Sequence, residues 1–305
     1  MSELRNRDTS MIKAKRIGHA TFATPDLDRQ IDYFQQVVGL CLAEREANRA
    51  FLATNSGQLA VVLEKGAQAG CSKLAFEVSP TLSVGEMAQR LSALGLKSEA
   101  RSDSLPGVST ALTFTDTKGT TIELFSDWSF VRKGPPAGGA VAIKLGHVAF
   151  AVPDPKATAD FYERVLGFRL SDWIGDYFVF LRCNADHHTV NFIRGPDSRM
   201  HHIAFEMRDG AHLHNSCDVL GQHKIEITWG PVRHGPGHNI AVYHRNPDEQ
   251  MVEFFSELDK MLDEEGGYFD PRPWHRDRPQ KPKVWAKDPS AANYWGIMPS
   301  EEMHK

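Results

Sequence analysis

Two histidines and one glutamate in the C-terminal half have the chemistry to hold a divalent metal ion. His147, His202 and Glu253 each lie in a short segment in which apolar and polar residues alternate, as in a half-buried β-strand. Two imidazoles and one carboxylate form the facial triad of non-haem iron(II) oxygenases, which leaves metal positions open for substrate and O2. The three residues are 55 and then 51 positions apart, so a single helix cannot hold them. We therefore expect three strands of one curved sheet to bring them together.

An internal repeat supports this arrangement. Residues 16–44 and 144–172 align without a gap at an offset of 128. Residues 73–78 match 202–207 at an offset of 129, and residues 121–126 match 251–256 at an offset of 130. The matched positions include Gly18/Gly146, His19/His147, Phe22/Phe150, Pro25/Pro153, Asp26/Asp154, Val37/Val165 and Gly39/Gly167. Such a small drift over a long segment indicates that the chain contains a duplicated module.

The two copies differ in chemistry at the positions of the metal ligands. The N-terminal copy has His19, Lys73 and Glu123 at these positions. An ammonium group has no lone pair and repels a cation, so we expect only the C-terminal copy to bind metal. A single histidine on a strand is more often a hydrogen-bonded structural residue, but three coincident matches at duplicated positions favour the metal site.

Each module is predicted to contain the same elements in the same order. These are a strand, a helix, a hairpin, a second helix and a final strand pair, at residues 18–24, 27–39, 49–66, 83–95 and 111–125 of the first module and at 146–152, 155–167, 176–195, 210–221 and 239–255 of the second. Pro-Asp supplies the helix N-cap in both copies, and Gly39 and Gly167 suit the helix C-terminus. We expect an α+β protein with an N-terminal extension (1–13), a first module (14–130), a linker (131–143) and a second module (144–258).

The last part of the chain, residues 259–305, has a different composition. It is rich in proline and tryptophan and shows little helical or strand periodicity. Disordered segments are usually poor in aromatic residues. We therefore expect this C-terminal tail to be an ordered arm over the body of the protein and a possible lid over the site.

The overall composition excludes several classes of function. The net charge is -4, with 35 basic and 39 acidic residues, so nothing in it would attract nucleic acid or an anionic membrane. Cys41, Cys71, Cys183 and Cys217 stand singly, as in a reduced compartment. The N-terminus lacks an apolar signal core, and the sequence contains no apolar run of 18 residues. We expect a soluble cytoplasmic protein.

The paired modules resemble the vicinal oxygen chelate superfamily, and the C-terminal half resembles its type I extradiol catechol dioxygenases. The resemblance covers residues 14–258 and is most specific over 230–254, GPVRHGPGHNIAVYHRNPDEQMVEF. It implies that each module is built from paired βαβββ repeats forming a curved, barrel-like mixed sheet. The turn of this motif lacks the glycine that is common in the family, which leaves its geometry open.

The same resemblance implies roles for residues around the metal. Glu253 matches the carboxylate ligand, Tyr243 matches a tyrosine just outside the metal ligands, and His234 matches the family's substrate-side histidine. Tyr243 and His234 are therefore expected to be catalytic residues that bind the substrate by donating hydrogen bonds to its ring oxygens. His188 matches the acid–base histidine, although the spacing does not distinguish it from His187. His238, in the loop that carries His234, is a further candidate for substrate binding.

Several other polar residues are expected to have no role in the reaction. His201 should point to the face of its strand opposite to His202. His212, His214 and His223 should lie at the surface. Arg245 could pair with an anionic substituent of the substrate, but a surface position fits it better.

The implied function is oxygen-dependent cleavage of a catechol ring beside its two hydroxyl groups, in the degradation of aromatic compounds. The cofactor would be Fe(2+), although the same ligands also serve Mn(2+). Histidine suits the base because its pKa lies near neutral pH. The substrates would be a small aromatic diol and O2, and the family implies a homo-oligomer. The alternatives are a hydroquinone or hydroxyquinol dioxygenase, a glyoxalase-like lyase or isomerase, and a non-catalytic aromatic-binding protein.

Overall fold

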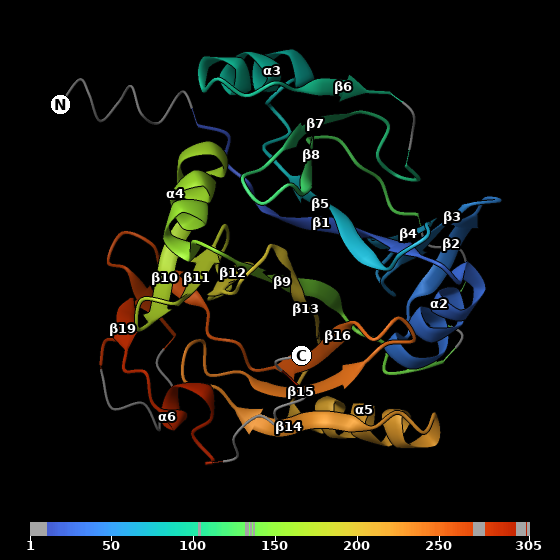
Figure 1. Ribbon diagram of the computed structural model, residues 1–305, viewed down its shortest axis with the longest axis vertical. Coiled ribbons are helices and arrows are strands. Elements are labelled where there is room, and N and C mark those ends of the chain that lie inside the picture. Colours follow the sequence, from blue (N-terminus) through green and yellow to red (C-terminus); the bar gives the residue numbers. More distant parts are fainter. Residues whose placement is uncertain are drawn as a thin grey trace.

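Two large mixed β-sheets, one from each half of the chain, make up most of the protein (Figure 1). The computed structural model describes residues 11–102, 105–131, 134, 136, 138–270, 278–296 and 303. No helix in these described parts is long and apolar enough to cross a membrane.

The N-terminal sheet has eight strands in the order β2-β3-β4-β1-β5-β8-β7-β6. Their bounds are β1 Arg16–Thr24, β2 Cys41–Arg45, β3 Arg49–Ala53, β4 Leu59–Lys65, β5 Gly70–Glu77, β6 Glu99–Arg101, β7 Ala111–Thr115 and β8 Thr121–Phe125. The helices are α2 (Leu27–Tyr33), which continues as a π-helix over Phe34–Val38, and α3 (Val84–Ala93). The order β1-α2-β2-β3-β4 is repeated as β5-α3-β6-β7-β8.

The C-terminal sheet repeats this plan and gains one strand from the tail. Its order is β14-β15-β16-β13-β9-β12-β11-β10-β19. The bounds are β9 Lys144–Val152, α4 Pro155–Leu166, β10 Arg169–Ile174, β11 Phe178–Arg182, β12 Val190–Arg194, β13 Arg199–Glu206, α5 Gly210–Gln222, β14 Ile227–Arg233, β15 Ile240–Arg245, β16 Met251–Ser256 and β19 Lys283–Trp285. The two βαβββ repeats meet where β9 pairs antiparallel with β13. The predicted fold class is therefore confirmed.

Local sequence signals explain where the first helix of each module begins and ends. The Asp26 and Asp154 side chains accept hydrogen bonds from the backbone N–H groups of Arg29 and Ala157. Both helical segments end at a glycine in the left-handed region, with φ of 81° at Gly39 and 68° at Gly167. The predicted N-caps and C-caps are confirmed.

The repeated glycine before each module's histidine has a packing role. A Cβ atom on Gly146 would lie 2.4 Å from the ring of Phe255, and one on Gly18 would lie 2.3 Å from Phe125. Both distances are far shorter than van der Waals contact, so only glycine fits there. The phenylalanine follows the module's glutamate by two residues, so this contact fixes the histidine strand next to the glutamate strand.

The turn between β15 and β16 forms without the glycine that is common in the family. Glu249 takes the left-handed backbone conformation, with φ of 60°. The Asn246 side chain accepts hydrogen bonds from the backbone N–H groups of Asp248 and Gln250. The polar side chain thus stabilises the turn just before the Glu253 strand.

The described part of the tail packs on the C-terminal module (Figure 1). Strands β17 (Met261–Asp263) and β18 (Tyr268–Phe269) form a small hairpin. Strand β19 then pairs parallel with β10 at the edge of the large sheet, and α6 (Pro289–Ala292) follows. The predicted domain limits and the lid function stay predictions.

Candidate active site

The predicted metal ligands lie on three adjacent strands, β9, β13 and β16. Ala204 on β13 pairs with His147 on one side and with Glu253 on the other, so these side chains share a face of the sheet. His202 lies two residues before Ala204 and therefore points to the same face. The structure brings together all three residues that the sequence analysis selected.

Their donor atoms form a compact triangle. His147 Nε2 lies 3.2 Å from His202 Nε2 and 3.2 Å from Glu253 Oε2, and His202 Nε2 lies 3.1 Å from that same oxygen. Ligands at about 2.1 Å from an octahedral metal ion and at right angles to each other lie roughly 3.0 Å apart. The donor set and its spacing thus fit a divalent metal ion bound to one face of an octahedron. This is the group of possible metal ligands found among the described residues.

Glu253 is ionised and held by a neighbour that the sequence analysis missed. Burial would raise the pKa of Glu253, but His147 and His202 outweigh this effect and hold the pKa well below its ordinary value. Asn239 donates a hydrogen bond from Nδ2 to Glu253 Oε1 at 3.0 Å. One carboxylate oxygen is therefore occupied, and the other faces the two histidines.

The prediction that His201 points away from the site is wrong. Its Nδ1 lies 2.7 Å from His202 Nδ1, and its side chain lines the cavity next to the triangle. The pairing of β13 with β9 shifts between Met200 and His202, so the strict alternation of faces is interrupted there. His201 thus contacts the ring nitrogen of His202 that does not face the triangle.

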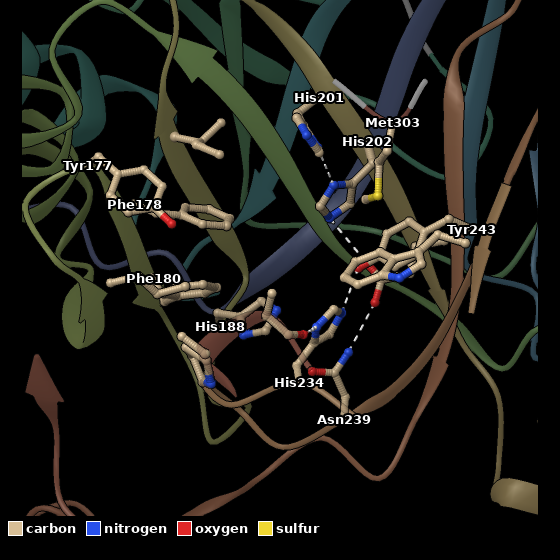
Figure 2. A pocket seen from close by; sticks show the side chains of 17 residues that line it. Tyr177, Phe178, Phe180, His188, His201, His202, His234, Asn239, Tyr243 and Met303 are labelled. Carbon is tan, nitrogen blue, oxygen red and sulfur yellow. Dashed lines mark hydrogen bonds and ion pairs between the residues drawn. The ribbon is translucent and has the colours of Figure 1, made fainter. Parts of the chain in front are cut away.

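A cavity of about 130 Å³ opens beside the triangle, and His202 and Glu253 line it. Figure 2 shows Tyr177, Phe178 and Phe180 on the side opposite to Tyr243. Ala291 and Ala292 of the tail form a further part of the wall. A cavity of about 150 Å³ is known to take one benzene ring, so this space suits a single aromatic ring.

His188 lines the cavity, whereas His187 lies behind it. The His188 ring centroid is 4.3 Å from that of His147 and 5.3 Å from that of Phe180. Burial, with the neighbouring histidines, lowers the pKa of His188 well below its ordinary value. Of the two adjacent histidines left open by the sequence, His188 is the one beside the ligands.

His234 and Tyr243 form a hydrogen-bonded pair on the cavity wall. His234 Nδ1 lies 2.8 Å from the Ala292 carbonyl oxygen, which can only accept, so this nitrogen carries the proton. In a neutral ring Nε2 is then the acceptor, and the Tyr243 hydroxyl, 2.7 Å away, donates to it. Burial raises the pKa of Tyr243 well above its ordinary value, with Glu253 acting in the same direction.

His238 does not line the cavity, contrary to the expectation that it contacts substrate. Its backbone has a positive φ of 49°, and its Nδ1 lies 2.6 Å from Asp259 Oδ2. The ring stacks on Tyr294 of the tail with centroids 5.8 Å apart. This turn directs the side chain to the tail and leaves the next residue, Asn239, facing the cavity.

The corresponding position of the N-terminal module holds a buried contact between a histidine and a glutamate. His19 Nε2 lies 3.1 Å from Glu123 Oε2, much as in the C-terminal triangle. Lys73 instead pairs with Glu64, with 2.9 Å between Nζ and Oε1. The strand register matches that of the other module, because Lys73 pairs with Thr21 and His202 with Ala149.

Comparison with known proteins identifies relatives along most of the chain. Biphenyl-2,3-diol 1,2-dioxygenase of Paraburkholderia xenovorans (strain LB400) is 28% identical over 262 residues, which cover 79% of this chain and 87% of the relative. Manganese-dependent 2,3-dihydroxybiphenyl 1,2-dioxygenase of Geobacillus genomosp. 3 is 22% identical, covering 88% of this chain and 93% of the relative.

Solved structures share the whole architecture. The Mn(II)-bound glyoxalase from Novosphingobium aromaticivorans superimposes with a TM-score of 0.83 at 26% identity, covering 96% of this chain and 94% of that one. Homoprotocatechuate 2,3-dioxygenase from Brevibacterium fuscum, in complex with 3,4-dihydroxyphenylacetate, gives a TM-score of 0.81 at 22% identity, covering 96% and 92%, and shows the fold alone. The family model described as Glyoxalase/Bleomycin resistance protein/Dioxygenase superfamily matches residues 16–124 and 144–254. The predicted resemblance is therefore confirmed, and the chain belongs to this superfamily.

Proposed function

We propose that this protein is an extradiol dioxygenase that cleaves the ring of a catechol-type compound with O2. The observation that carries the proposal is the triangle of His147, His202 and Glu253 opening directly onto a cavity sized for one aromatic ring. The dioxygenases among the relatives, which are named for aromatic diols, support the same reaction.

The three ligands would hold iron(II), with manganese(II) as the alternative. One relative is named as manganese-dependent, and nitrogen and carboxylate donors accept either ion. When bound, the metal would supply Lewis-acid activation of a substrate hydroxyl and positions for substrate and O2.

The residues around the metal site transfer a proton of the substrate and orient the substrate. His188 takes the proton of a substrate hydroxyl on its ring nitrogen and later returns it, since it is the histidine next to both ligands and cavity. Tyr243, whose pKa is raised by burial, stays protonated. His234 accepts a hydrogen bond from the Tyr243 hydroxyl and so holds its oxygen on the cavity wall, where that oxygen can accept a hydrogen bond from a diol hydroxyl. Both atoms of O2 enter the product as one ring carbon–carbon bond breaks, so the reaction needs no external reductant.

The cavity favours a catechol without a charged substituent. Among the described residues that line it, Glu253 is the one carboxylate, and neither lysine nor arginine occurs. Arg245, considered as a partner for an anionic substituent, donates to the backbone carbonyl of Glu249 in an exposed turn. A carboxylate on the ring would therefore meet no lysine or arginine among these described residues, and burying it against the apolar wall would cost several kcal/mol.

The test is to load metal-free protein anaerobically with iron(II) or manganese(II) and then add diols in air. The panel contains catechol, 3-methylcatechol, protocatechuate, hydroquinone and hydroxyquinol, with methylglyoxal plus glutathione as the glyoxalase substrate. We expect O2 uptake and a yellow product with the uncharged catechols. No O2 uptake with any diol would overturn the proposal, and turnover of methylglyoxal or hydroquinone instead would assign the alternative.

Two variants test the residue roles within this function. His202→Ala should lose both bound metal and turnover, because one of three ligands is removed. His188→Ala should keep the metal and lower kcat by about 100-fold or more, as expected for loss of a general base. Retained turnover in the first variant, or unchanged kcat in the second, would refute the role concerned.

A further inference from the structure

A chain of three buried side chains leads from the cavity to a carboxylate behind it. His188 Nδ1 lies 3.0 Å from His187 Nδ1, and His187 Nε2 lies 3.1 Å from Asp172 Oδ2. The exposed fractions are 3% for His188, 0% for His187 and 1% for Asp172. None of these contacts is accessible to bulk water, so each ring nitrogen must be satisfied within the chain.

Asp172 is surrounded by groups that can only donate. Its Oδ1 accepts from the backbone N–H of Lys283 at 2.8 Å, and its Oδ2 accepts from the indole N–H of Trp285 at 2.8 Å. Both donors belong to strand β19 of the tail, which pairs with the Asp172 strand β10. The carboxylate therefore acts as an acceptor on every side, and His187 Nε2 donates to it.

The proton positions on the two histidine rings follow from the hydrogen bond that His187 Nε2 donates to Asp172. A neutral His187 that carries its proton on Nε2 has a lone pair on Nδ1. That lone pair accepts from His188 Nδ1, so the proton of His188 sits on Nδ1. The free lone pair of His188 is then on Nε2, the nitrogen that is left for the cavity.

The His187 ring is held in place on several sides. A Cβ atom on Gly237 would lie only 3.1 Å from His187 Nδ1, so the glycine backbone packs closely on the ring. The Phe269 ring lies on it with centroids 5.0 Å apart, and the His187 backbone N–H donates to the Asp259 carbonyl. This packing leaves the ring little freedom to turn.

We propose that Asp172 and His187 are positioning residues that fix the ring orientation and the tautomer of His188, so that its Nε2 lone pair faces the substrate. The proposal rests on the proposed function for its kinetic consequence, but the tautomer is a property of the protein alone. It gives the tail a role in the reaction, because β19 supplies two of the three donors that hold Asp172.

The direct test is NMR on metal-free protein with 15N-labelled histidine. Two-bond 1H–15N correlations report which ring nitrogen carries the proton, and the signals of His188 are assigned by their loss in His188→Asn. We expect the Nδ1–H tautomer in the wild type and a shift toward Nε2–H in His187→Leu. An Nε2–H tautomer in the wild type, or no change in His187→Leu, would overturn the proposal whether or not the protein turns over any diol.

The kinetic test compares two substitutions at one position. His187→Leu removes the acceptor and should lower kcat by about 10- to 100-fold while KM and bound metal stay within twofold. His187→Asn restores an oxygen near the place of Nδ1 and should recover most of kcat. Equal losses in the two variants would show that volume, not the hydrogen bond, matters, and would overturn the proposal.

Three further variants separate positioning from general stability. In the His188→Ala background, His187→Leu should have no further effect on kcat, because the group it positions is gone; an independent loss would contradict the proposal. His19→Leu, which removes an equally buried imidazole from the N-terminal module, should lower the melting temperature but not kcat. Trp285→Phe keeps an aromatic side chain but removes the N–H donor to Asp172, and should lower kcat by a smaller factor than His187→Leu.

Discussion

Asn239 donates a hydrogen bond to Glu253 Oε1 at 3.0 Å, and this contact determines which carboxylate oxygen faces the two histidines. Asn239 is 1% exposed and lies in the loop directly before β15, whose residue Tyr243 pairs with Glu253. The carboxylate cannot rotate without breaking this bond inside the protein. The ligand geometry therefore depends on a residue that is not one of the three ligands.

Replacing Asn239 by alanine should weaken metal binding without unfolding the protein. Loss of a partner that orients a ligand typically lowers metal affinity by about 10- to 100-fold. The dissociation constants for iron(II) or manganese(II) can be measured by competition with a coloured chelator. Asn184→Ala is the matched control. It removes another asparagine side chain, which accepts a hydrogen bond from the backbone N–H of Asp186 and does not contact a metal ligand. Equal affinities in wild type and Asn239→Ala would contradict the orienting role.

The ligand triad could be predicted from the sequence because duplication marks it. Each ligand occupies a position that recurs in the other module, and period-two alternation fixes which face it occupies. The residues that contact the metal ligands, Asn239 and His201, could not be predicted in this way. Asn239 rather than His238 faces the cavity because of a positive φ at His238, and His201 turns inward where the strand pairing shifts. Such backbone irregularities break the periodicity on which sequence reasoning depends.

The contacts of the tail could also not be predicted from local sequence patterns. Trp285 and Asp172 are 113 residues apart, and neither position carries a motif. The composition of the tail predicted order because aromatic residues favour burial. Its composition did not indicate that a strand would add to the edge of the sheet, or which carboxylate that strand would hold.

A second metal site should appear in the N-terminal module when Lys73 is replaced by histidine. His19 and Glu123 already lie 3.1 Å apart, and Lys73 has the strand register of His202. The substitution removes the ammonium group and adds the missing imidazole. We expect the bound metal, measured by atomic emission after dialysis, to rise from one to two ions per chain. Lys73→Gln removes the same charge without adding a ligand and should remain at one.

Acid should destabilise the protein partly through Asp186. Burial would raise the pKa of Asp186, but the charges of Lys144 and Lys260 outweigh it and hold the pKa below 3.8. The ionised form thus stabilises the fold fully above the unfolded pKa of about 3.9, and this stabilisation is lost as pH falls through the lower folded pKa. In Asp186→Asn, urea unfolding should therefore depend less on pH between about pH 5 and pH 2.

The same variant should be less stable at pH 7 by roughly 1–3 kcal/mol, because its lysine partners lose a charged acceptor. Asp197→Asn provides the comparison, since Asp197 forms an exposed ion pair with Arg199 at 3.4 Å. Its stability should change by less than about 0.5 kcal/mol at any pH. A steeper acid dependence in Asp186→Asn than in the wild type would contradict the assigned role.

Removing the end of the tail should impair substrate binding more than metal binding. A chain ending at Pro282 loses Ala291 and Ala292 from the cavity wall, together with the Ala292 carbonyl that accepts from His234. None of the three ligands lies in the tail, so bound metal should stay at the wild-type amount. KM for catechol should rise by about 10-fold or more, because about 1.4 kcal/mol of lost binding corresponds to each factor of ten. A chain ending at Gly296 keeps β19 and α6 but loses Met303, which also lines the cavity, so its KM should rise by a smaller factor. If both truncations raise KM equally, the cavity wall formed by α6 is not what holds the substrate.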